Sequence, residues 1–189
     1  MNYWELIDGD NTLLINFDLD ENSIVFDFGG YKGDWALKIF KKYNSFIKIY
    51  EPIKEFYDSI INRFKNNDKI TVINKALHWK ESIIIFGVNK SDSGLFCDSK
   101  IKEIVTTVNV IDELNNIDID LLKINIEGME YLVLDHILRL GEINKIKNIL
   151  IQFHPVLLNE EIKEIQEKLF KTHKLIFSFP YIWEYWRLK

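Results

Sequence analysis

Short apolar runs rich in Ile, Val and Leu recur along the chain, and most are followed by a segment with apolar residues at helical spacing. The runs predict five strands, at residues 24–26, 47–50, 69–73, 120–127 and 147–153. The segments that follow four of them predict helices, at residues 34–44, 52–64, 131–140 and 159–171. Strand–helix units in succession build a parallel sheet with helices on its faces, so the pattern predicts an α/β fold.

Three regions depart from this pattern. Residues 1–22 contain alternating segments around an Asp-Gly-Asp-Asn turn signal, which predicts an N-terminal hairpin. Residues 82–110 contain two strand-like runs around a polar loop. We expect this insertion at the carboxyl rim of the sheet near the active site, either as a substrate-facing flap or as a decorative hairpin. Residues 174–188 predict an antiparallel C-terminal hairpin.

The first predicted strand runs into a glycine-rich turn, IVFDFGGYKGD, with Asp27 before Gly29, Gly30 and Gly33. Glycines allow positive φ and a close approach of the backbone to a ligand, so the turn predicts a nucleotide-cofactor loop. An NAD fingerprint has glycine where Asp27 stands, and a carboxylate there would repel a pyrophosphate. S-adenosylmethionine is cationic and has no phosphate, so it fits better. An NAD-dependent oxidoreductase remains the alternative.

Further cofactor contacts are expected from residues that leave the predicted strands. Glu51 ends the second strand, where a carboxylate can accept hydrogen bonds from both ribose hydroxyls. Asn74 and Ala76 leave the third strand, and Asn125 lies near the end of the fourth. The structural alternative is that Asp27 caps the next helix and Glu51 is an ordinary loop acid.

Candidate catalytic residues come from the predicted fourth and fifth strands. Lys123, Asn125 and Glu127 alternate with apolar residues and therefore share one face of the strand, where unsatisfied polar groups are costly. His154 leaves the fifth strand and is a candidate general base. We expect His154 and Glu127 to converge, because adjacent parallel strands lie close together. A salt-bridged network and a structural histidine are the alternatives.

Composition narrows the class of protein. The chain has 189 residues, of which 47% are hydrophobic, which suits one domain over 1–189. A net charge of −5 with dispersed lysines argues against nucleic acid as a partner. No apolar run reaches the length of a membrane span, and the single cysteine, Cys97, makes the cytoplasm the simplest setting. The aromatic residues Trp183, Tyr185 and Trp186 indicate either a homodimer interface or a cover for the sheet edge.

Four stretches resemble the FkbM-type methyltransferases, from Ile24 to about Pro155. They are VFDFGGYKG, Tyr50-Glu51-Pro52, the segment VIDEL at 110–114, and LLKINIEGMEYLVL, which is the most specific match. The resemblance implies a class I methyltransferase fold with a seven-stranded sheet whose last strand is antiparallel and lies beside the fifth. It also implies an enzyme that uses S-adenosylmethionine to methylate a hydroxyl of a sugar, sugar nucleotide or other small metabolite, in glycan or natural-product biosynthesis.

The chain departs from the family pattern at two positions. Asn125 stands where Asp is usual, and Gln152 stands where Glu is common. Acidic residues at these strand ends hold a divalent cation in some related enzymes, and amides bind such cations less strongly. We therefore expect no metal. We expect an in-line displacement with His154 or Glu127 as the base, and a methyltransferase-like binding module without catalysis remains an alternative.

Overall fold

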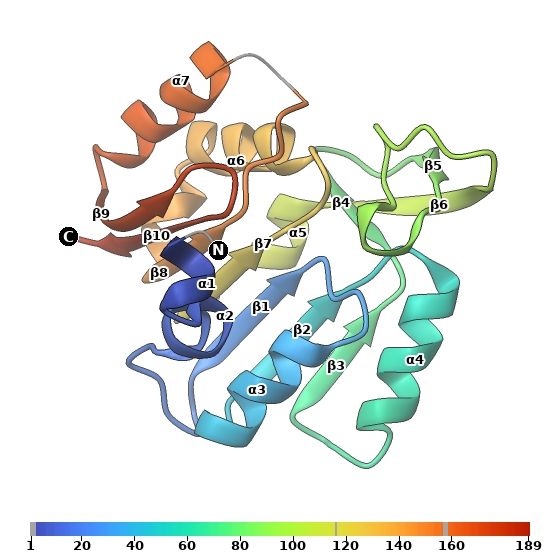
Figure 1. The fold of residues 1–189 in the computed structure, drawn as a ribbon, viewed down its shortest axis with the longest axis horizontal. Helices are drawn as coiled ribbons and strands as arrows, with labels where there is room; N and C mark the ends of the chain where they lie inside the picture. The colour runs from blue at the N-terminus through green and yellow to red at the C-terminus, as the bar shows by residue number, and fades with distance from the viewer. Residues whose placement is uncertain (1–2, 116, 157–158) are drawn as a thin grey trace.

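A seven-stranded sheet forms the centre of the computed structural model, which describes residues 3–115, 117–156 and 159–189 (Figure 1). Its strands lie in the order β3-β2-β1-β7-β8-β10-β9. Their bounds are β1 (Ile24–Phe28), β2 (Phe46–Tyr50), β3 (Ile70–Ile73), β7 (Leu121–Ile124), β8 (Asn148–Ile151), β9 (His173–Phe179) and β10 (Trp183–Leu188). Only β10 runs against its neighbours. The predicted mostly parallel sheet with an antiparallel C-terminal hairpin is confirmed.

Helices cover both faces of this sheet. The first face carries α3 (Asp34–Tyr43) and α4 (Lys54–Phe64), and the second carries α5 (Val110–Leu114), α6 (Glu130–Arg139) and α7 (Asn159–Leu169). Alternate side chains of a strand point to opposite faces. Val25 therefore packs in the same apolar cluster as α3 and α4, while Phe26 and Phe28 pack with α6. Strand β1, which leads into the glycine-rich loop, is thus held between two buried layers.

The predicted N-terminal hairpin is wrong. Its place is taken by short helices, α1 (Tyr3–Leu6), α2 (Gly9–Thr12) and η1 (Leu13–Ile15). The turn residues begin α2 instead: Asp8 precedes the helix in a left-handed conformation, and its carbonyl accepts hydrogen bonds from the backbone N–H and the hydroxyl of Thr12. Trp4 packs directly on Gly9, where a Cβ atom would lie 2.3 Å from its ring. A hairpin here would also have no neighbouring strand to pair with.

A second, three-stranded sheet stands beside the carboxyl ends of the main strands (Figure 1). Its strands lie in the order β4 (Ala76–His78), β6 (Lys102–Asn109) and β5 (Ile83–Gly87). The short helix η2 (Lys90–Asp92) lies in the loop between β5 and β6. The two strands expected in residues 82–110 are present, but β4 was not predicted, because three residues are too few to show a period. A separate apolar cluster lies under this sheet, formed by Ile53, Phe56, Ala76, Phe86 and Val105.

Two further predictions need correction. The strand predicted over 120–127 ends at Ile124, so Asn125 and Glu127 lie in the following turn and do not share a strand face with Lys123. The aromatic residues proposed for an interface are mostly internal, since Trp186 is fully buried and Trp183 is 7% exposed. A homodimer stays a prediction without that support.

The remaining short element is η3 (Glu142–Lys145), which follows Gly141, a residue with positive φ. Throughout the described ranges, no helix is long and apolar enough to cross a membrane. The extent of the single domain, residues 1–189, stays a prediction.

Candidate active site

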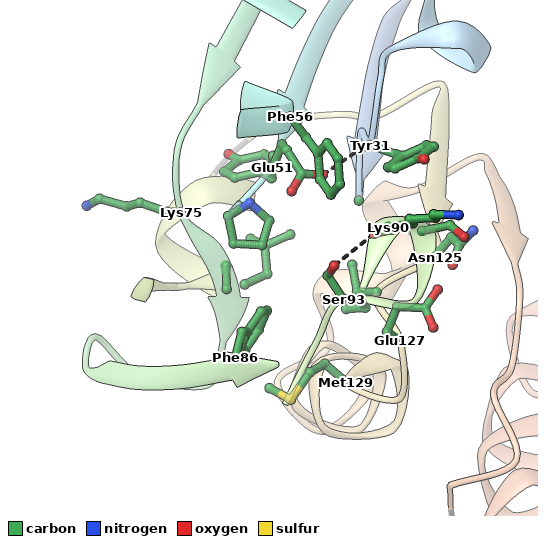
Figure 2. A pocket seen from close by; sticks show the side chains of 17 residues that line it. Tyr31, Glu51, Phe56, Lys75, Phe86, Lys90, Ser93, Asn125, Glu127 and Met129 are labelled. Atoms are coloured by element: carbon green, nitrogen blue, oxygen red, sulfur yellow. Dashed lines mark hydrogen bonds between the residues drawn. The ribbon is translucent and has the colours of Figure 1, made fainter. Parts of the chain in front are cut away.

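A cavity opens at the carboxyl ends of β1, β2 and β7, under the small sheet (Figure 2). The glycine loop, the turn after β2, the turn after β7 and the loop between β5 and β6 all contribute to its lining. Its residues include Gly29, Tyr31, Glu51, Asn125 and Glu127. Four segments that are far apart in sequence thus meet where open α/β sheets bind their ligands.

Gly29 brings the glycine loop into contact with the turn after β7. Its φ is +90°, and a Cβ atom there would lie 1.8 Å from the carbonyl oxygen of Asn125. At Gly30 a Cβ atom would lie 2.4 Å from the Ile49 side chain. Gly29 lines the cavity, whereas Gly30 and Gly33 do not. Of the three predicted loop residues, one can touch a ligand and two let the loop pack and turn behind it.

Glu51 is buried at the end of β2 and lines the same cavity. Its carboxylate accepts hydrogen bonds from the N–H of Tyr31 at 2.7 Å and of Ile53 at 2.9 Å. Burial raises the pKa of Glu51 to about 7, against the opposing effect of these two hydrogen bonds. The carboxylate thereby fixes the glycine loop relative to the β2 turn and still presents its remaining lone pairs to the cavity.

Asn74 and Ala76 differ in position although they were predicted together. Asn74 does not line the cavity; its side-chain amide donates to the carbonyls of Glu51 and Pro52, both at 2.9 Å. Ala76 is buried and lines the cavity. Asn74 therefore braces the turn that carries Glu51, while Ala76 forms part of the wall.

Asp27 and Lys123 form a closed ion pair beneath the glycine loop. Their side chains are 1% and 6% exposed, and Lys123 Nζ lies 2.7 Å from Asp27 Oδ1 and 2.7 Å from the carbonyl oxygen of Gly29. Burial raises the pKa of Asp27, and the charge of Lys123 opposes that shift. Neither residue lines the cavity, so this pair holds the loop from behind.

Two buried oxygens near the cavity have no hydrogen-bond partner among the described residues. They are Asn125 Oδ1 and Asp27 Oδ2. An unsatisfied buried acceptor is costly, so such an atom points to a missing donor. Only Asn125 lines the cavity, so its Oδ1 is the acceptor that a ligand there could satisfy. S-adenosylmethionine carries an ammonium group and ribose hydroxyls, and with the glycine contact at Gly29 and the Glu51 carboxylate the donors and acceptors of this cavity fit it.

Strained backbone gathers around the same cavity. Among the described residues, six that are not glycine have positive φ, and three of these six line this cavity. They are Tyr31 at +49°, Lys90 at +49° and Glu127 at +53°. Such conformations cost free energy and cluster at ligand sites, because the surrounding structure imposes them where function needs them. No sequence pattern revealed this strain.

A second cavity adjoins the first on the far side of Glu127. Its lining includes Asp92, Phe96, Asp98, Glu127 and His154, from the loop between β5 and β6 and from the turns after β7 and β8. Glu127 lines both cavities. One carboxylate is therefore accessible from two spaces, which suits a residue that acts between two bound molecules.

His154 lies between two carboxylates. Its Nε2 is 3.1 Å from Glu127 Oε1, and its Nδ1 is 2.9 Å from Glu130 Oε1. Burial would lower the pKa of His154, but the hydrogen bonds to both glutamates outweigh burial and raise the pKa to about 10. The expected convergence of His154 and Glu127 is present, and at neutral pH the imidazole is held as the cation.

Glu130 is a site residue that the sequence did not reveal. It is fully buried, and its carboxylate accepts hydrogen bonds from the N–H of Ile126 and of Gly128, both at 2.8 Å, in addition to its contact with His154. The available signal was an acid in the first turn of a helix after a glycine turn, where it caps free N–H groups. Glu130 shapes the turn that presents Glu127.

The amide residues Asn125 and Gln152 raise the question of whether the site could bind a metal ion. Gln152 lines neither cavity. The described ranges contain no group of three or more His, Cys, Asp or Glu side chains that could hold a metal ion. Metal-independent activity stays a prediction to be tested in solution.

The strand order and the position of this cavity are those of the class I methyltransferases. Solved structures with similar folds include an rRNA methylase from Streptococcus thermophilus (TM-score 0.54, 12% identity, covering 100% of this chain and 98% of that one). A precorrin-6y C5,15-methyltransferase from Geobacter metallireducens GS-15 is also similar (TM-score 0.51, 13% identity, 89% and 72% covered). At these identities the likeness concerns the fold alone.

The family itself follows from the sequence match. Residues 27–183 match the model of the methyltransferase FkbM domain, and the chain belongs to that family. The predicted resemblance is thereby confirmed. A search of curated proteins gave no significant match. Methyltransferases of this fold normally take their methyl group from S-adenosylmethionine.

Proposed function

We propose that the protein is an S-adenosylmethionine-dependent O-methyltransferase that acts on a hydroxyl of a sugar or another small hydroxylated metabolite. One observation carries the proposal: Glu127 lines both cavities and is held by His154 at 3.1 Å. The first cavity suits the cofactor, and the second suits the acceptor. A binding module without catalysis would not need the second cavity.

The cofactor cavity offers complementary groups at several points. Glu51 is proposed to accept hydrogen bonds from the ribose, and Gly29 and Ala76 form the close walls. Asn125, which lines this cavity, has an Oδ1 acceptor still without a donor among the described residues. When bound, S-adenosylmethionine supplies an electrophilic methyl group on a sulfonium.

Glu127 is the base in this proposal, and His154 is a positioning residue. The high pKa of His154 leaves the imidazole protonated at neutral pH, so it cannot accept a further proton. It can hold the Glu127 carboxylate toward the acceptor hydroxyl, which loses its proton to Glu127 as its oxygen attacks the methyl carbon. Glu130 fixes the imidazole from the opposite side. Most of the rate enhancement would come from orienting the reactants and excluding water.

The lining of the second cavity supports this class of acceptor. Asp92, Asp98 and Glu127 supply carboxylates that accept hydrogen bonds from hydroxyl groups, and Phe96 supplies an aromatic surface. Such a mixture of a flat apolar surface and a few polar groups is suited to a neutral sugar. The same carboxylates would repel a phosphate, so the RNA substrates named for some structural neighbours are not proposed here.

A labelling experiment tests the proposed function. The protein is incubated with methyl-labelled S-adenosylmethionine and a panel of neutral sugars, sugar nucleotides and hydroxylated metabolites, and products are analysed by mass spectrometry and NMR. We expect a methyl ether on a neutral hydroxylated acceptor. Transfer to nitrogen or carbon would refute O-methylation. Tight binding of NADH without any binding of S-adenosylhomocysteine would refute the cofactor.

A variant of Glu51 tests the assignment of the first cavity to the cofactor. Glu51→Ala is expected to weaken S-adenosylhomocysteine binding about 10-fold to 100-fold in isothermal titration, through the lost hydrogen bonds to the ribose. Glu55→Ala, on the exposed start of α4, removes a like charge outside the cavity and serves as the control.

A further inference from the structure

The loop between β5 and β6 borders both cavities. Lys90, Ser91 and Ser93 line the cofactor cavity, whereas Asp92 and Phe96 line the acceptor cavity. Residues that are neighbours in sequence thus face different spaces. This loop forms part of the wall between the two cavities, and its side chains are placed to contact either ligand.

Lys90 is held in position by its own turn. The Ser93 hydroxyl donates to the carbonyl of Lys90 and accepts from the N–H of Asn89, both at 2.8 Å. The backbone of Lys90 has φ +49°, a strained conformation in a residue with a side chain. These hydrogen bonds fix the backbone of Lys90, an exposed residue at the edge of the cofactor cavity.

The turn is also anchored to the catalytic segment. Gly87 and Gly94 exchange backbone hydrogen bonds of 2.9 and 3.0 Å, and a Cβ atom at Gly94 would lie 2.9 Å from the Cβ of Glu127. Lys90 lies between these two glycines in sequence. Its position is therefore fixed relative to Glu127 and to the cofactor cavity.

The charge of Lys90 has no counterpart in the described part of the chain. No hydrogen bond or ion pair joins its ammonium group to a described residue. The other lysine of the cavity lining, Lys75, points away from the remaining labelled side chains in Figure 2. Lys90 is thus the cation that the cavity offers to an anionic group of a ligand.

We propose that Lys90 binds the carboxylate at the amino-acid end of the cofactor. The proposal rests on the proposed function, because it takes S-adenosylmethionine as the ligand. That molecule has one anionic group, the carboxylate, and its adenosine part has none. Figure 2 shows Glu51 and Lys90 at well separated points of the cavity, as the ribose and the amino-acid end of one extended ligand require.

Two ligands that differ at the amino-acid end test this contact. S-adenosylhomocysteine has the carboxylate, and 5′-methylthioadenosine lacks the whole amino-acid end. We expect Lys90→Ala to weaken S-adenosylhomocysteine about tenfold in isothermal titration and to leave 5′-methylthioadenosine unchanged. Lys90→Arg keeps the charge and should retain most of the affinity. Lys100→Ala, an exposed lysine of the same loop outside both cavities, is the matched control.

The outcomes separate the two proposals. If Lys90→Ala weakens both ligands equally, or neither, the carboxylate contact is wrong while the cofactor assignment stands. If the unaltered protein binds neither ligand, the proposed function fails, and this inference fails with it. Melting temperatures of the variants, which we expect to match that of the parent protein, exclude loss of folding as the cause.

Discussion

The Asp27–Lys123 and Glu127–His154 pairs both belong to neighbouring strands of one sheet or to the turns that follow them, but they differ in their access to the cavities. The first pair lies within β1 and β7. Its Lys123 Nζ is 2.7 Å from Asp27 Oδ1, and the side chains of Asp27 and Lys123 are 1% and 6% exposed. The second pair lies three residues beyond the ends of β7 and β8. Its His154 Nε2 is 3.1 Å from Glu127 Oε1, and the side chains of Glu127 and His154 are 21% and 17% exposed.

A shift of a few residues along the chain therefore separates an ion pair that stabilises the sheet from one that is exposed to the cavities. A charged pair inside the sheet is enclosed by the helices and can only hold the backbone. The charged pair beyond the strand ends lines the cavities, although it is made of the same kinds of group. The comparison predicts that the first pair governs stability and the second governs turnover.

The largest expected effect is on turnover. Glu127→Gln removes the proposed proton acceptor and should lower kcat about 10²-fold to 10⁴-fold, with S-adenosylhomocysteine affinity close to that of the parent. Turnover is measured by methyl transfer to the acceptor found by screening. Glu81→Gln, which removes an exposed carboxylate outside both cavities, is the control. Near-normal turnover in Glu127→Gln would assign the proton to another acceptor.

The next effect is on stability. Lys123→Met leaves the Asp27 carboxylate buried without its partner, which should lower the free energy of unfolding by about 3–5 kcal/mol. Urea denaturation measures the loss. The double variant Asp27→Asn with Lys123→Met removes both charges and should recover part of it. A loss below about 1 kcal/mol in the single variant would show that the ion pair does not hold the loop.

A smaller effect is expected on the pH dependence of stability. Because the pKa of His154 rises from 6.5 to about 10 on folding, the folded protein holds this proton when the unfolded chain has lost it. The stabilisation is complete below pH 6.5 and is lost as the pH rises toward 10, with a slope of up to about 1.4 kcal/mol per pH unit. His154→Gln should flatten this decline in urea denaturation between pH 7 and 9. Identical slopes would mean that His154 is neutral.

The smallest expected effect is that of metal removal. Neither Asn125 nor Gln152 carries a carboxylate, and the described residues include no group of three or more His, Cys, Asp or Glu that could hold a metal ion, so EDTA should leave methyl transfer largely unchanged. Initial rates before and after chelation provide the measurement. Loss of activity that Mg²⁺ restores would overturn this prediction.

The elements of the sheet were predictable because buried strands and amphipathic helices leave periodic patterns. The same patterns predicted that His154 and Glu127 would meet, since both follow adjacent parallel strands. The N-terminal segment was mispredicted because an Asp-Gly-Asp-Asn turn caps a helix as readily as it closes a hairpin. What decided between them was the packing of Trp4 on Gly9, which only the fold reveals.

The composition of the site was less predictable than its location. Alternation in a strand gives the face of a side chain but not its distance from the strand end, so Lys123 was taken for a catalytic candidate although it lines neither cavity. Lys90 lines the cofactor cavity in a backbone conformation with positive φ, and no sequence pattern predicts that conformation. Glu130 resembles any acid in a first helical turn until its contact with His154 is known.

The three left-handed residues around the cofactor cavity have a consequence for engineering. Glycine or asparagine adopts this conformation more easily than Tyr31, Lys90 or Glu127 does. A selection for thermal tolerance alone would therefore favour their replacement, and it would remove side chains that line the cofactor cavity and that we propose to contact the ligands. Selection for thermal stability should therefore favour glycine or asparagine at these three positions, whereas selection for catalysis should favour the present residues.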